Sequence, residues 1–204
     1  AESLLQIKAI KLNPTTPFQW ASGWNSPIYC DNRKTLSYPP ARTYIRQQFV
    51  DAITERYPNV EVIAGVATGG IALGALVAEA MGLPFAYVRS ASKGHGMQNM
   101  IEGDITPNQK VVVIEDLIST GGSSLKAVAA LREHGSDVLG MVAIFTYGFD
   151  IAVNNFEENK CDIVTLSDYD SMLKAAVNAN YVSETDIASL SEWRKAPQTW
   201  APNK

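Results

Sequence analysis

Apolar and polar positions follow two periods along the chain, and each period predicts one type of element. Runs of apolar residues predict buried strands at Val60–Gly65, Pro84–Val88, Lys110–Ile114, Asp137–Thr146 and Asp162–Leu166. Helical spacing between them predicts helices at Ile71–Met81 and Ser123–His134. Strands that alternate with helices of this length imply right-handed crossovers and a parallel sheet covered on both faces. The predicted fold class is therefore α/β.

The segments on either side of this region have other patterns. We predict a short amphipathic helix over Leu4–Leu12, a small hood of short strands over Phe18–Asp31, and a helix over Ala41–Tyr57. Two more helices are predicted at Asp168–Ala179 and Ser183–Lys195. We expect a single domain over residues 1–204, with a hood-forming segment at 1–40, an α/β core at 60–166 and C-terminal helices at 167–204.

Composition and charge narrow the function classes. The 204 residues are 46% hydrophobic and carry 17 basic against 21 acidic side chains, so a nucleic-acid partner is not expected. The two cysteines, Cys30 and Cys161, have no metal-site or disulfide spacing, and we expect reduced thiols in a cytoplasmic protein. No long apolar stretch and no basic-then-apolar leader is present, so we expect neither a membrane partner nor export.

The most informative segment is Val111–Ser124, where an apolar strand runs into two acids and then into a Ser/Thr/Gly turn that opens a helix. The N–H groups of such a turn and of the helix N-terminus form a donor site for a phosphate dianion. Two acids beside it would repel a phosphate, so they suit sugar hydroxyls or Mg²⁺. The segment predicts a holder of ribose 5-phosphate, formed by Glu115, Asp116, Leu117, Ile118, Ser119, Thr120, Gly121, Gly122 and Ser123. The simpler alternative is a capped helix with solvated acids.

Other nucleotide-binding motifs are disfavoured. The chain has no G-x-x-x-x-G-K-[ST], and Gly94–Asn99 lacks the last glycine of G-x-G-x-x-G. These observations argue against a P-loop NTPase and against a Rossmann dehydrogenase.

Two further turns carry candidate chemistry. Arg89, Lys93 and His95 lie on a glycine-containing stretch that has almost no apolar anchors, so we predict a mobile lid that carries positive charge. An exposed basic loop is the alternative. Thr68 and Gly69 lie in a strand-to-helix turn whose N–H groups could hold an anion, and a tight turn without a ligand is the alternative there.

Three segments together resemble a known family. Val111–Ser124 resembles the phosphoribosyl-pyrophosphate (PRPP) signature of type I phosphoribosyltransferases. Tyr87–Gly96, followed by Ile101–Gly103, resembles the mobile loop of orotate phosphoribosyltransferases, and Phe18–Arg33 resembles their Ser-Gly-x-x-Ser-Pro hood. The match runs from about Pro14 to Asp150. In four places where many relatives carry lysine or arginine, this chain has Ala21, Gly69, Ser90 and Tyr147.

The resemblance implies both a fold and a reaction. It implies a type I phosphoribosyltransferase-like parallel sheet, flanked by helices, with a hood and a mobile lid. It also implies transfer of the phosphoribosyl group of PRPP to orotate in pyrimidine synthesis, with Mg²⁺ bound mainly through PRPP. A homodimer that shares its lids across subunits is implied as well. A phosphoribosyltransferase for a purine or another base, and a non-catalytic PRPP-sensing regulator, are the alternatives.

The same resemblance assigns roles to individual residues. It implies that Arg89, Lys93 and His95 stabilise the leaving pyrophosphate and exclude water, and that Thr68 and Gly69 hold the pyrophosphate. Lys93 or His95 could also deliver a proton, and Ser119 could reach the edge of orotate. Ser22 of the hood is expected to contact substrate. Arg33 is our candidate for the orotate carboxylate, with a surface arginine that braces the hood as the alternative.

Overall fold

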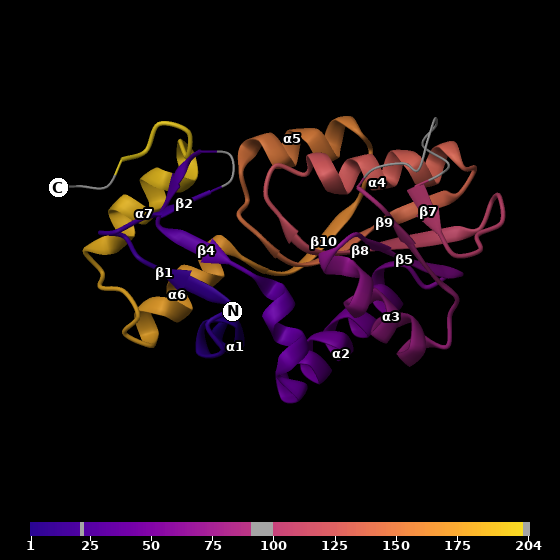
Figure 1. The fold of residues 1–204 in the computed structure, drawn as a ribbon, viewed down its shortest axis with the longest axis horizontal. Helices are drawn as coiled ribbons and strands as arrows, with labels where there is room; N and C mark the ends of the chain where they lie inside the picture. Colours follow the sequence, from indigo (N-terminus) through magenta and orange to yellow (C-terminus); the bar gives the residue numbers. More distant parts are fainter. Residues whose placement is uncertain (21–22, 91–99, 202–204) are drawn as a thin grey trace.

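A six-stranded sheet forms the centre of the protein, which is represented here by a computed structural model that describes residues 1–20, 23–90 and 100–201 (Figure 1). Its strand order is β10-β9-β8-β5-β6-β7. The strands are β5 (Val62–Val66), β6 (Phe85–Val88), β7 (Ile101–Glu102), β8 (Lys110–Ile118), β9 (Asp137–Thr146) and β10 (Ile163–Asp168). The predicted parallel pairing is confirmed for five strands, whereas the unpredicted β7 pairs antiparallel with β6 at one edge.

Helices cover both faces of the sheet, as predicted. Helices α2 (Pro39–Arg56) and α3 (Gly69–Met81) lie on one face, and α4 (Gly122–Glu133) and α5 (Asp150–Glu158) lie on the other (Figure 1). Neighbouring side chains of a strand point to opposite faces, so Val112 joins the cluster under α2 and α3 while Val113 joins the one under α4 and α5. Burial on both faces explains why these strands are continuous apolar runs.

The hood consists of short strands, as predicted, but its first segment differs from the prediction. Strand β2 (Phe18–Gln19) pairs with β3 (Asn25–Ser26), and a 3-10 helix η1 (Asn32–Ser37) follows. The predicted helix over Leu4–Leu12 is wrong in its second half. Helix α1 ends at Gln6 (Glu2–Gln6), and Ile10–Leu12 forms strand β1, which pairs with β4 (Ile28–Cys30). Lys8 has a positive φ of 55°, which a helix does not allow, so sheet pairing replaces the helix there.

The C-terminal helices pack against the hood. Helices α6 (Tyr169–Asn178) and α7 (Asp186–Lys195) lie beside the hood strands, far from β7 (Figure 1). Trp193 of α7 is fully buried, and its ring lies 5.5 Å from that of Trp20 and 5.7 Å from that of Tyr147. Its Nε1 donates a hydrogen bond of 3.1 Å to the main-chain oxygen of Asn25. The two ends of the chain therefore form one packed unit.

Two elements near the carboxyl ends of the strands differ from the sequence prediction. Strand β8 continues to Ile118 because β9 pairs with it as far as Ile118 and Thr146, so Glu115 and Asp116 lie within the strand and not after it. Helix α5 was not predicted. Within the described residues, no helix is long and apolar enough to cross a membrane.

Replacing the central aromatic of this packed unit tests how much it contributes to stability. We expect Trp193→Ala to lower the free energy of unfolding by about 3–5 kcal/mol, because it leaves a cavity among four rings and removes the hydrogen bond to Asn25. Urea denaturation followed by circular dichroism measures this change. Glu192→Ala, an exposed change on the same helix, should stay within about 0.5 kcal/mol of wild type. Equal effects of the two substitutions would contradict this packing.

Candidate active site

The two acids predicted to hold a sugar lie at the carboxyl end of β8 and are held differently. Glu115 is only 5% exposed. Its Oε2 accepts a hydrogen bond of 2.8 Å from the Ser124 hydroxyl, and its Oε1 accepts one of 3.0 Å from the Asp116 main-chain N–H. Burial, reinforced by the charge of Asp116, raises the pKa of Glu115 to about 8. Glu115 therefore ties β8 to the first turn of α4.

Asp116 lies beside the turn that contains Thr68 and Gly69, the second turn predicted to bind an anion. A Cβ atom at Gly69 would overlap the Asp116 carboxyl group, so only glycine allows this approach. Burial raises the pKa of Asp116, and the nearby charge of Arg33 opposes that rise. The peptide bond between Ala67 and Thr68 is cis, and Thr68 itself is exposed. The acids in the last part of β8 and the turn after its neighbour β5 thus converge on one place, as the carboxyl ends of parallel strands do.

The Ser/Thr/Gly turn between β8 and α4 rests on the helix that the sequence did not predict. Asn155 of α5 donates a hydrogen bond of 2.9 Å from Nδ2 to the main-chain oxygen of Thr120. Gly121 has a φ of +82°, and a Cβ there would press on the ring of Phe156. Gly122 and Ser123, at the start of α4, are exposed. The N-terminal amides of α4 are therefore held in place and open to an anion.

A cavity of about 520 Å³ lies between this turn and the hood. The hood supplies most of one wall, and the β8–α4 turn supplies the other. The lining residues are Gln19, Trp20, Trp24, Tyr29, Cys30, Leu117, Ser119, Thr120 and Tyr147. The rings of Trp20 and Trp24 are stacked, and Tyr147 is buried against Trp20. Aromatic faces beside two hydroxyls suit a planar ring with polar edges.

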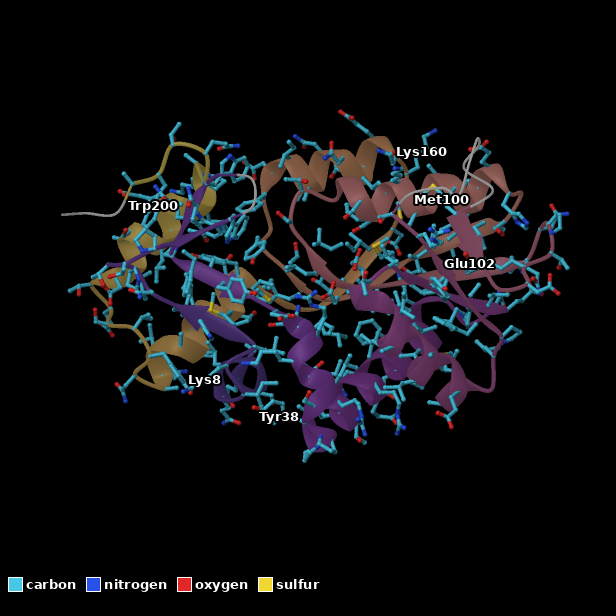
Figure 2. The ribbon with its side chains drawn as sticks, viewed as in Figure 1. Lys8, Tyr38, Met100, Glu102, Lys160 and Trp200 are labelled. Carbon is cyan, nitrogen blue, oxygen red and sulfur yellow. The ribbon has the colours of Figure 1, made fainter. Side chains whose placement is uncertain are left out.

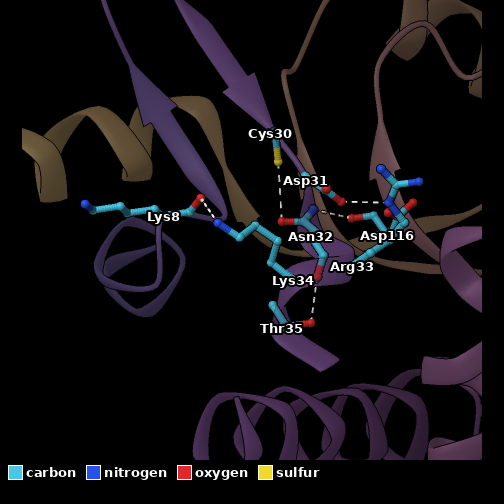
Figure 3. A network of polar contacts seen from close by, with 8 residues as sticks. All are labelled: Lys8, Cys30, Asp31, Asn32, Arg33, Lys34, Thr35 and Asp116. Carbon is cyan, nitrogen blue, oxygen red and sulfur yellow. Dashed lines mark hydrogen bonds and ion pairs between the residues drawn. The ribbon is translucent and has the colours of Figure 1, made fainter. Parts of the chain in front are cut away.

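The described cations lie at the borders of the site. Arg33 Nε donates a hydrogen bond of 2.7 Å to Asp31, its side chain is 57% exposed, and its charge reaches Asp116 (Figure 3). Arg89 Nη1 lies 3.5 Å from a carboxylate oxygen of Glu102. The main-chain N–H of Arg89 also donates to the oxygen of Met100, so Arg89 lies where the predicted lid begins. Figure 2 shows Met100 and Glu102 at the β7 end of the molecule and Trp200 at the opposite end.

The structure brings together most of the predicted site and adds residues that the sequence did not reveal. Asp116, Gly69 and Arg33 converge, and Leu117, Ser119 and Thr120 line one cavity. Ile118 points into the core and is 1% exposed. Ser22, Lys93 and His95 lie outside the described residues. The unpredicted residues are Asn155, Phe156 and Asn32. The side-chain amide of Asn32 contacts the main chain of Asp116.

Comparison with known proteins agrees with this geometry. Residues 44–177 match the phosphoribosyl transferase domain family. The chain is 58% identical over 200 residues to the orotate phosphoribosyltransferase of Porphyromonas gingivalis, covering 98% of this chain and 95% of that protein. It is 59% identical over 200 residues to that of Cytophaga hutchinsonii, covering 98% and 96%. The chain belongs to the orotate phosphoribosyltransferase family. This membership confirms the resemblance that the three sequence segments carried.

A solved structure of the orotate phosphoribosyltransferase family has the same architecture. The crystal structure of orotate phosphoribosyltransferase from Aeropyrum pernix superposes with a TM-score of 0.76 at 25% identity, and the match covers 89% of this chain and 98% of that one. The α/β sheet with its flanking helices is therefore a fold that this family member shares with the enzyme from Aeropyrum pernix.

The acidic residues of this family member are candidate ligands for a metal ion. Within the part of the chain that the structure describes, no group of three or more His, Cys, Asp or Glu side chains could hold a metal ion. Asp116 nevertheless supplies carboxylate oxygens of the kind that Mg²⁺ prefers, whereas both oxygens of the buried Glu115 already accept hydrogen bonds. Asp116 therefore fits a magnesium ion that takes most of its ligands from a bound substrate.

The raised pKa of Glu115 predicts how pH affects stability. The folded state holds this proton more tightly than the unfolded state, in which the pKa has its ordinary value of 4.5. The contribution of Glu115 to the free energy of unfolding is therefore fully present below about pH 4.5 and is lost as the pH rises through about 8. We expect Glu115→Gln to flatten this decline between pH 5 and pH 8, as measured by urea denaturation at several pH values.

A second acid with a raised pKa and an exposed glutamate provide the comparisons for that experiment. The raised pKa of Asp116 should leave part of the decline in the variant. The exposed substitution Glu157→Gln should keep the wild-type pH profile. A Glu115→Gln profile parallel to that of wild type would show that this carboxyl group does not bind its proton more tightly in the folded state.

Proposed function

We infer that the protein transfers the phosphoribosyl group of PRPP to orotate, giving orotidine 5'-monophosphate and pyrophosphate in pyrimidine nucleotide synthesis. The observation that carries this inference is one continuous site. An aromatic cavity shares Ser119 and Thr120 with the turn that opens α4, and the acid pair adjoins this turn. Such a site can hold a planar base next to a sugar phosphate. Its relatives of 58% and 59% identity are orotate phosphoribosyltransferases.

Each part of the PRPP molecule has a proposed partner. Asp116 and Glu115 bind the ribose hydroxyls, which can donate hydrogen bonds to carboxylates. Residues Ser119 to Ser123 bind the 5'-phosphate through main-chain N–H groups and hydroxyls. Thr68 and Gly69 bind the pyrophosphate. The contact between Gly69 and the Asp116 carboxyl group supports this order, because it places the pyrophosphate turn next to the proposed ribose site.

Orotate occupies the cavity beneath the hood in this proposal. The ring would lie against aromatic side chains such as Trp20 and Tyr147, and Ser119 would meet its polar edge. Its carboxylate needs a cation, and Arg33 is our candidate because it is a described cation at the border of the site, paired with Asp31 and outside the cavity lining. Ser22 of the hood would contribute a further polar contact.

The chemistry consists mainly of positioning and charge stabilisation. The bond between the anomeric carbon and the pyrophosphate oxygen breaks, a bond from the orotate nitrogen to that carbon forms, and the nitrogen loses its proton. Arg89, Lys93 and His95 would stabilise the charge on the leaving pyrophosphate and exclude water. Lys93 or His95 would move the proton. Mg²⁺, bound mainly through PRPP and held on the protein side by Asp116, would supply additional positive charge for the pyrophosphate.

The assembly and location belong to the same proposal. We propose a homodimer in which the lid residues of one subunit serve the site of its partner. We also propose a cytoplasmic location, in keeping with two free cysteines, Cys30 and Cys161.

Pyrophosphate release with a panel of bases tests the proposed function. We expect release with PRPP, Mg²⁺ and orotate, and at least about 100-fold less with uracil, adenine, hypoxanthine or xanthine. The reason is that a site built for polar edges loses those hydrogen bonds with the wrong base. A coupled pyrophosphate assay measures the rates. Faster release with a purine would show that a purine, and not orotate, is the substrate. No release with any base would favour a PRPP-sensing regulator.

The acid assigned to the ribose can be tested by a single substitution. We expect Asp116→Asn to weaken PRPP binding by about 10-fold or more, because a charged acceptor for the sugar hydroxyls is lost. Isothermal titration calorimetry with PRPP and Mg²⁺ measures the affinity. Asp170→Asn, which changes an exposed acid paired with Arg194, is the control and should bind PRPP as wild type does. Unaltered affinity in Asp116→Asn would make this residue a structural acid.

A further inference from the structure

A buried amide in the hood contacts the main chain of the acid pair. Asn32, the first residue of η1, is 1% exposed, and its Nδ2 donates a hydrogen bond of 2.6 Å to the main-chain oxygen of Asp116. The two residues are 84 positions apart in the chain. Figure 3 shows Asn32 lying between Cys30 of β4 and Asp116 of β8. This bond joins the hood to the strand that carries the proposed ribose site.

The orientation of the Asn32 side chain is fixed by its neighbours. Its Oδ1 accepts a hydrogen bond of 3.3 Å from the thiol of Cys30, so its Nδ2 is the atom that faces Asp116. Burial raises the pKa of Cys30, which keeps the thiol protonated and able to donate. The main-chain oxygen of Asn32 also accepts a hydrogen bond of 2.7 Å from Thr35 Oγ1. Cys30 and Asp116 therefore hold the two ends of the side-chain amide, the oxygen and the nitrogen.

The position of Asp116 in the sheet explains why such a support matters. The ladder between β5 and β8 ends at the Gly65–Ile114 pair, two residues before Asp116. Strand β8 continues past this point with pairing to β9 alone. The Asn32 amide supplies a donor to the main chain where the β5 ladder has ended. A carbonyl that loses such a partner is left unsatisfied, so the strand would shift to find another.

We propose that Asn32 is a positioning residue for the reaction, which holds Asp116 in register for the ribose of PRPP. This rests on the proposed function, in which Asp116 binds the sugar. Asn32 does not line the cavity, so its effect reaches the substrate through Asp116. Cys30, which fixes the amide, does line the cavity. The same hydrogen-bonded chain therefore runs from the base cavity to the ribose site.

Two substitutions at position 32 separate positioning from general support. Asn32→Ala removes the donor, and we expect it to lower kcat/KM for PRPP by about 10- to 100-fold, because small displacements of reacting groups have effects of that size. Asn32→Asp keeps the shape but places a carboxyl group against the Asp116 carbonyl. When protonated, that carboxyl group can donate the missing hydrogen bond, and when ionised it cannot.

The Asn32→Asp variant therefore has a distinctive pH profile. Its kcat/KM for PRPP, divided by that of wild type at the same pH, should rise as the pH falls from 8 to 5.5, while the corresponding ratio for Asn32→Ala stays flat. The titratable or charged groups around position 32 are Cys30, Asp31, Arg33, Lys34, Glu115 and Asp116. Wild type and Asn32→Ala share all of them, so these groups cancel in the ratio for Asn32→Ala.

Thr35→Val is the matched control. It removes a buried hydrogen bond from the same 3-10 helix but leaves the amide on Asp116, so we expect near-wild-type kcat/KM for PRPP. Thermal unfolding of all three variants shows whether they are folded. If Asn32→Ala keeps wild-type kcat/KM, or if the folded Asn32→Asp variant loses as much kcat/KM at pH 5.5 as Asn32→Ala does, the positioning role is overturned.

Failure of the proposed function would look different. In that case wild type itself would release no pyrophosphate with orotate. Calorimetry of PRPP binding to wild type and Asn32→Ala would then still test the positioning role, with about a 10-fold weaker affinity expected for the variant and equal affinities contradicting it.

Discussion

The close contact between the first turn of α3 and the end of β8 is the constraint on which the site depends. A Cβ at Gly69 would overlap the Asp116 carboxyl group, and a Cβ at Gly70 would overlap the main-chain oxygen of Ile114. With glycine at both positions, the turn after β5 lies directly on the neighbouring strand. The N–H groups of that turn and the carboxylate of Asp116 are then neighbours. In the proposed function, PRPP would meet both its pyrophosphate partner and its sugar partner there.

The other half of the site is built from both ends of the chain. The hood carries the aromatic wall of the cavity, and short two-stranded sheets such as these are not stable alone. Trp193 of α7 packs on Trp20 and donates a hydrogen bond to the main chain of Asn25, while Asn32 joins the hood to β8. The C-terminal helices therefore support the cavity although they contribute no residue to its lining.

The sequence predicted elements well where burial decides the structure and poorly where long-range contacts decide it. The strand Asp137–Thr146 was predicted with the boundaries it has, because both faces of it are buried and the run is apolar. By contrast, β8 extends to Ile118 because β9 continues beside it, which no local pattern in Glu115 and Asp116 indicates. Sheet pairing with β4 likewise determined the structure of Ile10–Leu12.

The same difference applies to the site. The acids and the Ser/Thr/Gly turn could be found because their residue types and order are themselves the chemistry. Asn32 and Asn155 gave no such signal, since a single asparagine is ordinary in a surface segment. Their importance comes from partners 84 and 35 positions away, at Asp116 and Thr120.

The distribution of charge indicates how binding and catalysis are divided in the proposed mechanism. Neither the turn at residues 65–70 nor the segment at residues 115–123 contains a lysine or arginine, so main-chain N–H groups are the donors there. Burial also raises the pKa of both acids, which lessens their repulsion of an anionic ligand. The cations assigned to the pyrophosphate, Arg89, Lys93 and His95, all come from one separate segment. If that segment meets the pyrophosphate only when it closes, its positive charge acts mainly where negative charge develops, and this stabilises the transition state more than the bound substrate.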